Sequence, residues 1–277
     1  MTVVAVIAQG EMGAGLGRRL SKSGARVLTS LQGRSPASAE RARAAQMEPV
    51  EDDQRLVDAA DFVLSVVPPG EAAALARRLA PALAAAGNKP VYIEANAISP
   101  RRTAEVAAIL APTGAPVVDG GIIGAPPRPG TAGPRLYVSG EAAARAESLR
   151  AHGLDIRVLD GGIGVASALK LAYASLTKGT VAIGAATMLG AMRGGVAPAL
   201  RAELAASQSA MAARIAQEVP RMYSKAYRWV AEMEEIADFL AASPGARKIY
   251  EGAAELYAEL ARDDGAAVAL IDRFLER

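Results

Sequence analysis

The stretch VVAVIAQGEMGAGLGRRL, residues 3–20, constrains the fold most, because an apolar run breaks into glycines and then becomes helical. Its β-branched residues are continuous instead of alternating, which is typical of a parallel strand buried on both faces in the centre of a sheet. Gly10 and Gly13 follow the strand, with Ala8 where such a turn usually has its first glycine. The stretch therefore predicts the first βα unit of a dinucleotide-binding domain.

The predicted turn assigns a task to each of its residues. Gly10 would let the backbone approach a pyrophosphate, and Gly13 would let the helix pack closely on the strand. The backbone amides of Glu11, Met12 and Gly13 would point toward the phosphates from the N-terminus of the helix. Ala8 restricts the backbone conformations open to the turn but does not prevent the turn from forming. Glycine-rich turns also serve packing alone, so packing stays open as the alternative to dinucleotide binding.

The composition predicts a globular protein of about two domains. The 277 residues are 51% hydrophobic and 22% charged, which is enough to bury a large core. The net charge of +2 is spread along the chain without runs, which argues against nucleic acid as a partner. The sequence has no cysteine, which excludes disulfides and thiolate chemistry. A metal site is not predicted either, because no carboxylate pair or histidine cluster indicates one.

The sequence predicts a protein that does not cross a membrane. Its longest apolar stretch, between Lys178 and Arg193, has 14 residues, fewer than the roughly 20 that span a bilayer. The chain passes from Met1 straight into the first strand without a charged leader, so we expect a cytoplasmic protein.

The second predicted strand, residues 25–30, and the loop LQGRSPAS after it bear on the choice between NAD and NADP. An NAD site has a carboxylate at the end of this strand, whereas no acidic residue appears here before Glu40. Ser30, Arg34 and Ser35 instead offer hydroxyl groups and a guanidinium that can fork onto a phosphate. The sequence therefore favours NADP, with an ordinary solvated arginine as the alternative.

Further strands are predicted in βαβ rhythm, which indicates an α/β fold with a doubly wound Rossmann sheet. These strands span residues 60–67, 90–95, 116–119 and 136–139. Ligands lie over the carboxyl ends of the strands in such sheets, so we expect Val67, Pro68 and Asn96 to face the nicotinamide. Prolines and a lone asparagine also simply shape such turns, which is the alternative.

From Gly161 the pattern changes to that of an all-α domain. Residues 161–195 predict a long helix that is apolar nearly all round and therefore buried on most sides. Further helices are predicted over residues 198–217, 219–242 and 246–262. We therefore predict a dinucleotide-binding domain over residues 1–160 and an all-helical domain over residues 161–277. Because so few further helices would leave the long helix uncovered in a monomer, we expect a homodimer.

Lys170 lies among apolar neighbours on the long helix. A lysine in such surroundings is costly unless it is paired or lines a cavity. Helical spacing places it on one stripe with Ser167, Ala174 and Thr177. If this stripe faces the cofactor, Lys170 meets the substrate. A lysine that merely extends its charged end into water is the alternative.

Three motifs, taken in order, point to one family. They are E-M-G at residues 11–13, V-D-G-G-I-I-G at residues 118–124, and G-x-G-x-x-x-x-x-K at residues 162–170. Together they resemble the β-hydroxyacid dehydrogenases, which include 6-phosphogluconate dehydrogenase. The resemblance implies a Rossmann domain, an all-helical dimerisation domain and Lys170 as the catalytic acid/base. The stretch RMYSKAYRWVAEM, residues 221–233, is similar to a branch whose members are often uncharacterised.

The resemblance also implies where the substrate lies and where this chain departs from the pattern. Gly121, Ile123 and Gly124 fall in the segment that borders the substrate, and Ile123 replaces a carboxylate-binding serine, which weakens the case for a simple 3-hydroxy acid. Ala174 replaces an asparagine that helps to hold the substrate. Thr177 stands where the decarboxylating phosphogluconate enzymes have an acidic residue, so we do not expect decarboxylation.

An aromatic cluster provides a further candidate for the substrate pocket. Tyr223, Tyr227 and Trp229 lie in one predicted helix, and a spacing of four puts the two tyrosines on one face. Their rings would accept an apolar or aromatic part of a substrate, with the hydroxyl groups orienting its polar end. Packing in the core is the alternative.

Taken together, these patterns predict an enzyme that uses NADPH to reduce a small-molecule carbonyl substrate. Lys170 would donate a proton to the carbonyl oxygen, a role that suits a group that is protonated at neutral pH. Imine reductases share the architecture but usually have another residue at this position, so an imine reductase is one alternative. A non-catalytic NADP-binding sensor is another. His152, the only histidine, is predicted to be solvated.

Overall fold

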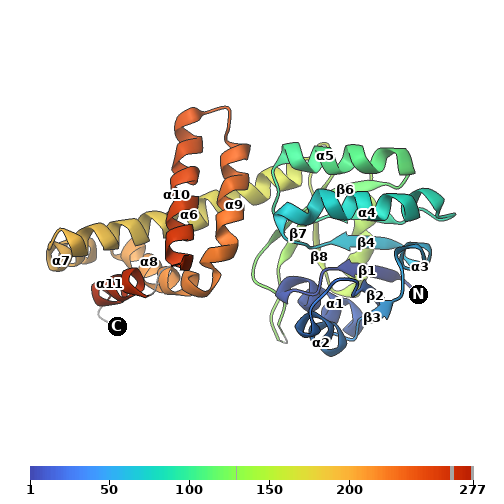
Figure 1. Ribbon diagram of the computed structural model, residues 1–277, viewed down its shortest axis with the longest axis horizontal. Coiled ribbons are helices and arrows are strands. Elements are labelled where there is room, and N and C mark those ends of the chain that lie inside the picture. The colour runs from blue at the N-terminus through green and yellow to red at the C-terminus, as the bar shows by residue number, and fades with distance from the viewer. Residues whose placement is uncertain (129, 263–264, 276–277) are drawn as a thin grey trace. The chain divides into compact units, whose positions relative to one another are not determined.

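The computed structural model describes residues 1–128, 130–262 and 265–275 (Figure 1). The chain divides into two compact units, residues 1–170 and residues 171–277. The first unit is a Rossmann-like sheet with helices and the second is helical, which confirms the predicted fold class. The predicted domain boundary between residues 160 and 161 remains a prediction.

In the described residues of the first unit, eight strands form one sheet in the order β3-β2-β1-β4-β5-β6-β7-β8. Neighbouring strands are parallel except for β6 and β7, which are antiparallel. β1 lies in the interior of the sheet, as its continuous apolar sequence predicted. The strands are β1 (Val3–Ile7), β2 (Arg26–Ser30), β3 (Glu48–Val50), β4 (Phe62–Ser65), β5 (Val91–Glu94), β6 (Val117–Ile123), β7 (Arg135–Ser139) and β8 (Asp155–Val158).

Helices cover both faces of this sheet, as Figure 1 shows. Val4 and Val6 of β1 belong to one core with Leu16 of the following helix, whereas Ala5 and Ile7 belong to a second core on the opposite face. The alternation follows from the two-residue period of a strand. The α-helices of this unit are α1 (Glu11–Lys22), α2 (Pro36–Ala44), α3 (Asp53–Ala59), α4 (Ala72–Ala85), α5 (Pro100–Leu110) and the first turns of α6 (Val165–Arg193). Short 3₁₀ helices are η1 (Pro69–Glu71), η2 (Ala111–Thr113) and η3 (Ala143–His152).

Four elements of this unit, namely α2, α3, β3 and β8, were not predicted from the sequence. Both helices carry start signals, because Ser35 and Asp52 are N-caps that accept hydrogen bonds from backbone N–H groups three residues on. β3 has only three residues and pairs along one edge alone, and β8 is also an edge strand. Such short, partly exposed strands lack the apolar pattern by which buried strands are predicted.

The second unit contains the rest of α6 and five further α-helices in the described residues. They are α7 (Ala197–Ser207), α8 (Ser209–Met222), α9 (Ala226–Phe239), α10 (Pro244–Arg262) and α11 (Ala266–Phe274), with a 3₁₀ turn, η4 (Tyr223–Lys225), between α8 and α9. Two of the predicted helices were wrong in extent. The chain breaks at Gln208 within the first of them and at η4 within the second.

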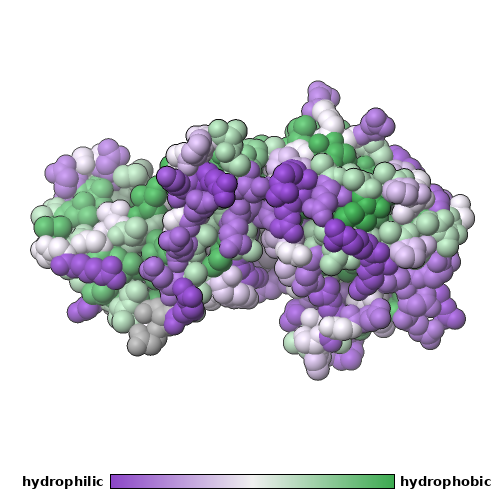
Figure 2. Space-filling view, turned by 45° about the horizontal axis from the view of Figure 1, so that its top comes forward, coloured by the Kyte–Doolittle hydropathy of each residue, from purple (hydrophilic) through white to green (hydrophobic). Residues whose placement is uncertain are grey.

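α6 keeps an exposed side in the single chain, so its burial on most sides, which the sequence predicts together with a homodimer, remains a prediction. One side of the helix packs in the core of the second unit through residues such as Leu171, Ala182 and Leu189. Tyr173, Leu176 and Ile183 are 51%, 68% and 61% exposed. Their spacing of three and seven places them along one stripe of the helix. Figure 2 shows that hydrophobic residues reach the surface of the helical unit on the face in view.

Gly121 in β6 sets how closely α6 approaches the sheet. A Cβ at this position would lie 2.6 Å from the carbonyl oxygen of Ala166 and 3.0 Å from the Cβ of Lys170. The first contact is with backbone, which cannot rotate away. The missing side chain therefore fixes the first turns of α6 against β6.

We predict that Gly121→Ala lowers the free energy of unfolding of the first unit by about 1 to 3 kcal/mol, because the added methyl group displaces α6 from β6. Thermal and urea unfolding followed by circular dichroism measure the change. Gly87→Ala is the matched control, since a Cβ there has no neighbour within 4 Å. Equal stability of the two variants would contradict the prediction.

Candidate functional site

The turn between β1 and α1 lies at the edge of the sheet where the parallel strands end. Gly10 is the N-cap of α1 and has no side chain to bond the N–H groups of Glu11, Met12 and Gly13. A Cβ on Gly13 would lie 1.7 Å from the carbonyl oxygen of Ala8, so only glycine fits there. A Cβ on Gly10 would have nothing within 4 Å. The turn thus has the amides and the open approach that a pyrophosphate requires.

Gln9, which the sequence analysis did not single out, ties this turn to β2. Its side-chain amide is buried and donates to the hydroxyl of Thr29 and, at 3.0 Å, to the carbonyl oxygen of Ser30. Thr29 in turn donates to the carbonyl oxygen of Val6 at 2.7 Å. A glutamine between alanine and glycine gives no pattern signal, so the sequence could not show this role.

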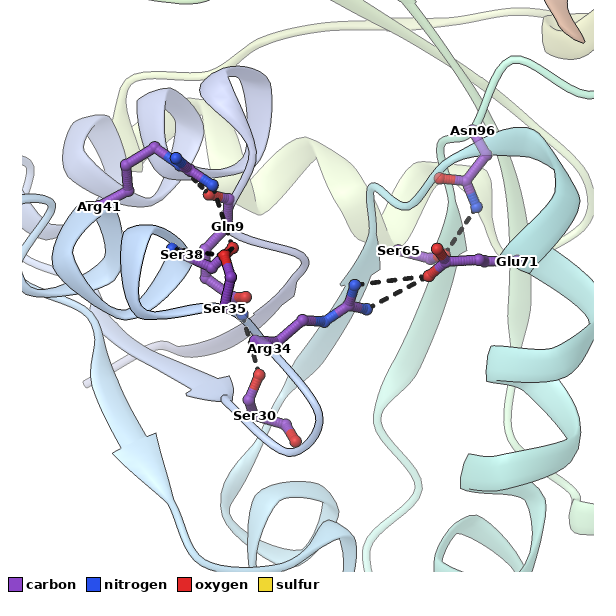
Figure 3. Close-up of polar contacts among 9 residues, drawn as sticks. All are labelled: Gln9, Ser30, Arg34, Ser35, Ser38, Arg41, Ser65, Glu71 and Asn96. Carbon is purple, nitrogen blue, oxygen red and sulfur yellow. Dashed lines mark hydrogen bonds and ion pairs between the residues drawn. The ribbon is translucent and has the colours of Figure 1, made fainter. Parts of the chain in front are cut away.

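The structure places Ser30, Arg34 and Ser35 at the end of β2, as predicted, but gives them different tasks (Figure 3). Ser30 is buried, and its carbonyl oxygen accepts the bond from Gln9. Ser35 caps α2, with its hydroxyl accepting from the N–H of Ser38 at 3.3 Å. Both guanidinium ends of Arg34 lie 3.4 and 3.5 Å from one carboxylate oxygen of Glu71. Arg34 is therefore the one cation among the three predicted residues.

Arg41 is a second cation near the dinucleotide turn that the sequence analysis did not single out. From α2 it donates to the carbonyl oxygen of Gln9 at 2.6 Å and to the hydroxyl of Ser38 at 3.0 Å. In Figure 3 the guanidinium of Arg34 extends toward Glu71, away from Arg41 and Gln9. Two arginines thus approach the ends of β1 and β2 from one helix and one loop.

Val67, Pro68 and Asn96 follow β4 and β5 at the same edge. Val67 is buried, and Pro68 is exposed and precedes η1. Asn96 is 3% exposed, and its side-chain N–H₂ donates to the hydroxyl of Ser65 at 2.8 Å. The same group also donates to a carboxyl oxygen of Glu94.

Glu94 is a buried titratable group at this edge that was not predicted from the sequence. It closes β5 with no solvent exposure, and the backbone N–H of Asn96 donates to it at 3.1 Å. Burial raises the pKa of the Glu94 carboxyl to about 8, the hydrogen bonds from Asn96 and Ser65 oppose this rise, and the charge of Asp119 adds to it. A carboxylate within the apolar segment PVYIEA was the signal that could have identified it.

Asp119 in β6 holds the N-terminus of α6. One of its carboxyl oxygens accepts from the backbone N–H groups of Gly164 at 2.9 Å and Ser167 at 3.1 Å. The hydroxyls of Ser167 and Ser139 also donate to this carboxylate, at 2.5 and 3.0 Å. All the partners are buried, so the start of α6 is fixed on β6 and β7. Ser167, predicted to share a stripe with Lys170, serves this anchor.

Lys170 lies one turn after this anchor, beside Gly121. Its side chain is half-buried, and its amine forms no hydrogen bond or ion pair within the described residues. Gly121 and Ile123 point to the same face of β6 because they are two residues apart. Ile123 is buried, and Gly124 is exposed with a positive φ of 130°. The first unit thus brings Lys170 to the strand that carries the predicted substrate segment.

The second unit carries the remaining predicted substrate residues. Ala174 is buried in its core, and the hydroxyl of Thr177 donates to the carbonyl oxygen of Tyr173 at 3.0 Å. Tyr223 is half-buried in η4 and donates to Asp272 at 2.9 Å, whereas Tyr227 in α9 is 66% exposed. The break at η4 means that the two tyrosines do not share one continuous helix. A role for these four residues at the substrate remains a prediction.

Other kinds of site find no support in the part of the chain that the structure describes. No group of three or more histidine, cysteine or acidic side chains there could hold a metal ion. No described helix combines the length and the hydrophobicity that a membrane span requires. His152 lies at the end of η3, with a ring nitrogen 3.1 Å from the carbonyl oxygen of Ser23.

The fold and the dinucleotide turn, at the edge where the parallel strands end, together define a nucleotide-binding protein of the Rossmann class with a helical second unit. A family model described as the NAD binding domain of 6-phosphogluconate dehydrogenase matches residues 3–151, more than half of the chain. The chain therefore belongs to this family, which confirms the predicted resemblance. A second model, a domain of unknown function (DUF1932), matches residues 191–260. No curated protein matches the sequence.

Solved structures of similar fold cover nearly the whole chain. The conserved protein MTH1747, of unknown function and described as similar to 3-hydroxyacid dehydrogenases, is 28% identical, with 97% of this chain and 99% of that chain covered and a TM-score of 0.72. The 3-hydroxyisobutyrate dehydrogenase of Mycobacterium tuberculosis is 21% identical, with 99% of both chains covered and a TM-score of 0.73. The imine reductase of Myxococcus stipitatus with NADP⁺ is 21% identical, with 99% and 100% covered and a TM-score of 0.56. The chain thus has an NAD(P)-binding fold like that of the hydroxyacid dehydrogenases.

The buried Glu94 carboxyl predicts how stability depends on pH. Its pKa is raised from 4.5 to about 8 on folding, so the folded state binds the proton more tightly than the unfolded state does. Stability therefore falls as the pH rises from about 5 to 8, by up to about 1.4 kcal/mol per pH unit, and then levels off.

Urea unfolding at several pH values measures this slope in the wild type and in Glu94→Gln, which keeps the shape but cannot ionise. We expect a flatter profile for Glu94→Gln between pH 5 and 8. Glu105→Gln, at an ion-paired surface site with a side-chain exposure of 43%, is the control and should keep the wild-type profile. Parallel profiles for wild type and Glu94→Gln would refute the prediction.

Proposed function

We propose that this protein is an oxidoreductase that uses NADPH to reduce the carbonyl group of a small molecule. The observation that carries the proposal is the placement of Lys170 against Gly121, on the unit that also holds the dinucleotide turn. Family membership supports the proposed use of a nicotinamide dinucleotide, and the relatives described as dehydrogenases support the proposed class of reaction.

The turn from Ala8 to Gly13 would hold the pyrophosphate through the amides of Glu11, Met12 and Gly13. Arg34 would release Glu71 to pair with a ribose phosphate, a change that its long contact of 3.4 to 3.5 Å favours over a tight salt bridge. Val67, Pro68 and Asn96 would lie beside the nicotinamide. Bound NADPH supplies a hydride to the carbonyl carbon.

Lys170 would supply the proton. Its ammonium has no hydrogen-bond partner within the described residues, so its three N–H groups are available to a substrate oxygen. The proton passes from Nζ to the carbonyl oxygen as the carbon becomes reduced. The Asp119 anchor would keep the lysine in place, because it fixes the helix one turn earlier.

Within the first unit, the substrate would meet Asn96, Gly121, Ile123 and Gly124. Ile123 offers no polar group where a carboxylate-binding serine was expected, which favours a substrate without a simple 3-hydroxy acid group. The exposed stripe of Tyr173, Leu176 and Ile183 supports the predicted homodimer through the helical unit.

A second candidate is the reduction of an imine. It is favoured by solved imine reductases whose fold covers nearly the whole chain. Lys170 favours a carbonyl substrate over an imine, because an iminium ion already carries the proton that the lysine would supply.

The decisive experiment is NADPH consumption measured with a panel of ketones, 2- and 3-keto acids, semialdehydes and cyclic imines. With the best carbonyl substrate, we expect Lys170→Ala to lower turnover at least about 100-fold while NADPH affinity stays unchanged. Lys248→Ala, at an exposed site on α10, is the matched control. Full turnover in Lys170→Ala would remove the mechanism, and NADPH binding without turnover on any compound would favour a sensor.

The proposed cofactor preference predicts a specific effect of Arg34→Ala. Charge-assisted bonds to a 2′-phosphate are worth about 1.5 to 3 kcal/mol, so NADPH affinity should fall about 10- to 150-fold. NADH affinity should hardly change. Isothermal titration calorimetry with both cofactors measures the two effects. Equal losses for NADPH and NADH would mean that Arg34 only stabilises its loop.

A further inference from the structure

The side-chain oxygen of Asn96 is a buried acceptor that lacks a partner within the described residues. Asn96 itself is 3% exposed and follows β5 at the edge where the parallel strands end. An unpaired buried acceptor loses its hydration without compensation, which is costly in a folded protein. The position therefore points to a hydrogen-bond donor that the described residues do not supply.

The orientation of the Asn96 carboxamide is fixed by its nitrogen. Its N–H₂ group donates both to the hydroxyl of Ser65, at 2.8 Å, and to a carboxyl oxygen of Glu94. The same carboxyl oxygen accepts the backbone N–H of Asn96 at 3.1 Å. A flipped carboxamide would turn its oxygen toward the accepting oxygen of Glu94. The amide oxygen is therefore held away from these two partners, and Figure 3 shows that the nitrogen of the carboxamide, not its oxygen, is turned toward Ser65.

Glu94 can hold this orientation whether or not it is ionised. Oε1 accepts both N–H groups, whereas Oε2 has no partner within the described residues and so is free to carry a proton. Burial, which raises the pKa of this carboxyl, keeps the proton there at neutral pH. The strand register supports the arrangement, because Ser65 lies directly beside Glu94 on the neighbouring strand.

We propose that Glu94 and Ser65 are positioning residues that hold the oxygen of Asn96 toward the carboxamide N–H₂ group of the nicotinamide ring. This inference rests on the proposed dinucleotide site and adds a recognition contact to it. The donor is assigned to the cofactor because Asn96 lies in the unit that carries the dinucleotide turn. Glu94 would not touch the ligand and would act only through Asn96.

Two cofactor analogues separate this contact from the rest of the cofactor. Thionicotinamide adenine dinucleotide phosphate keeps the N–H₂ group, and 3-acetylpyridine adenine dinucleotide phosphate has a methyl group in its place. Calorimetric titration of the wild type should give about 5- to 30-fold weaker binding of the acetylpyridine analogue. No substrate is present, so a donor on the substrate cannot produce this difference.

Variants test the positioning role through the ratio of two affinities, that for the thionicotinamide analogue divided by that for the acetylpyridine analogue. Asn96→Leu and Glu94→Leu should reduce the ratio to within about twofold, because the first lacks the oxygen and the second frees the carboxamide to rotate. Glu94→Gln should restore discrimination, because its carbonyl oxygen can accept both N–H groups. Glu105→Leu, on the surface of α5, should leave the ratio unchanged. If Glu94→Leu does not fold, Ser65→Ala replaces it, with a partial loss of discrimination expected.

The outcomes distinguish this inference from the proposed function. Equal binding of both analogues by the wild type would overturn the inference and leave the dinucleotide site standing. Full discrimination in a folded Glu94→Leu protein would overturn the role of Glu94. Failure of the wild type to bind NADPH and both analogues would overturn the proposed function and this contact together.

Discussion

The hydrogen bonds between Asp119 and the first turn of α6 are the interaction on which the arrangement of the site depends. Without them, two backbone N–H groups at a buried helix start would lack partners, because glycine precedes the helix and offers no side chain. The negative carboxylate also suits the positive end of the helix dipole. Lys170 lies one turn further on. This anchor and the missing side chain of Gly121 therefore together fix the backbone position from which the Lys170 side chain extends.

The same carboxylate belongs to a row of polar residues that crosses the sheet. Strand register places Ser65 beside Glu94, Glu94 beside Asp119 and Asp119 beside Ser139, all fully buried. The two acids are supported differently. Asp119 receives four donors, whereas Glu94 receives N–H groups only from Asn96 and lies in surroundings that raise its pKa. Two adjacent buried carboxyl groups are compatible because only one of them needs to carry charge.

The architecture could be predicted from the sequence because its main elements have strong local patterns. Continuous apolar strands, the turn from Ala8 to Gly13 and the glycines around residue 161 each have a direct physical meaning. Gln9, Arg41 and Glu94 could not be placed in the same way. Gln9 and Arg41 bond to partners 20 or more residues away. Glu94 accepts hydrogen bonds from nearby Asn96 but lies beside Ser65 and Asp119 of the neighbouring strands. Spacing along the chain carries no information about such contacts between elements. The helix break at η4 was missed because residues 223–225 have no glycine or proline to mark it.

The reversal of direction between β6 and β7 has a consequence for how such proteins change over evolutionary time. The chain leaves the sheet at Ile123 and returns at Arg135, and these two residues face each other across the strand pair. The pairing of Asp119 with Ser139 secures the register from the far end. Insertions or deletions in the connection therefore leave the sheet intact. Because the connection begins directly after the segment beside Lys170, its length can change without moving the strand that carries this segment.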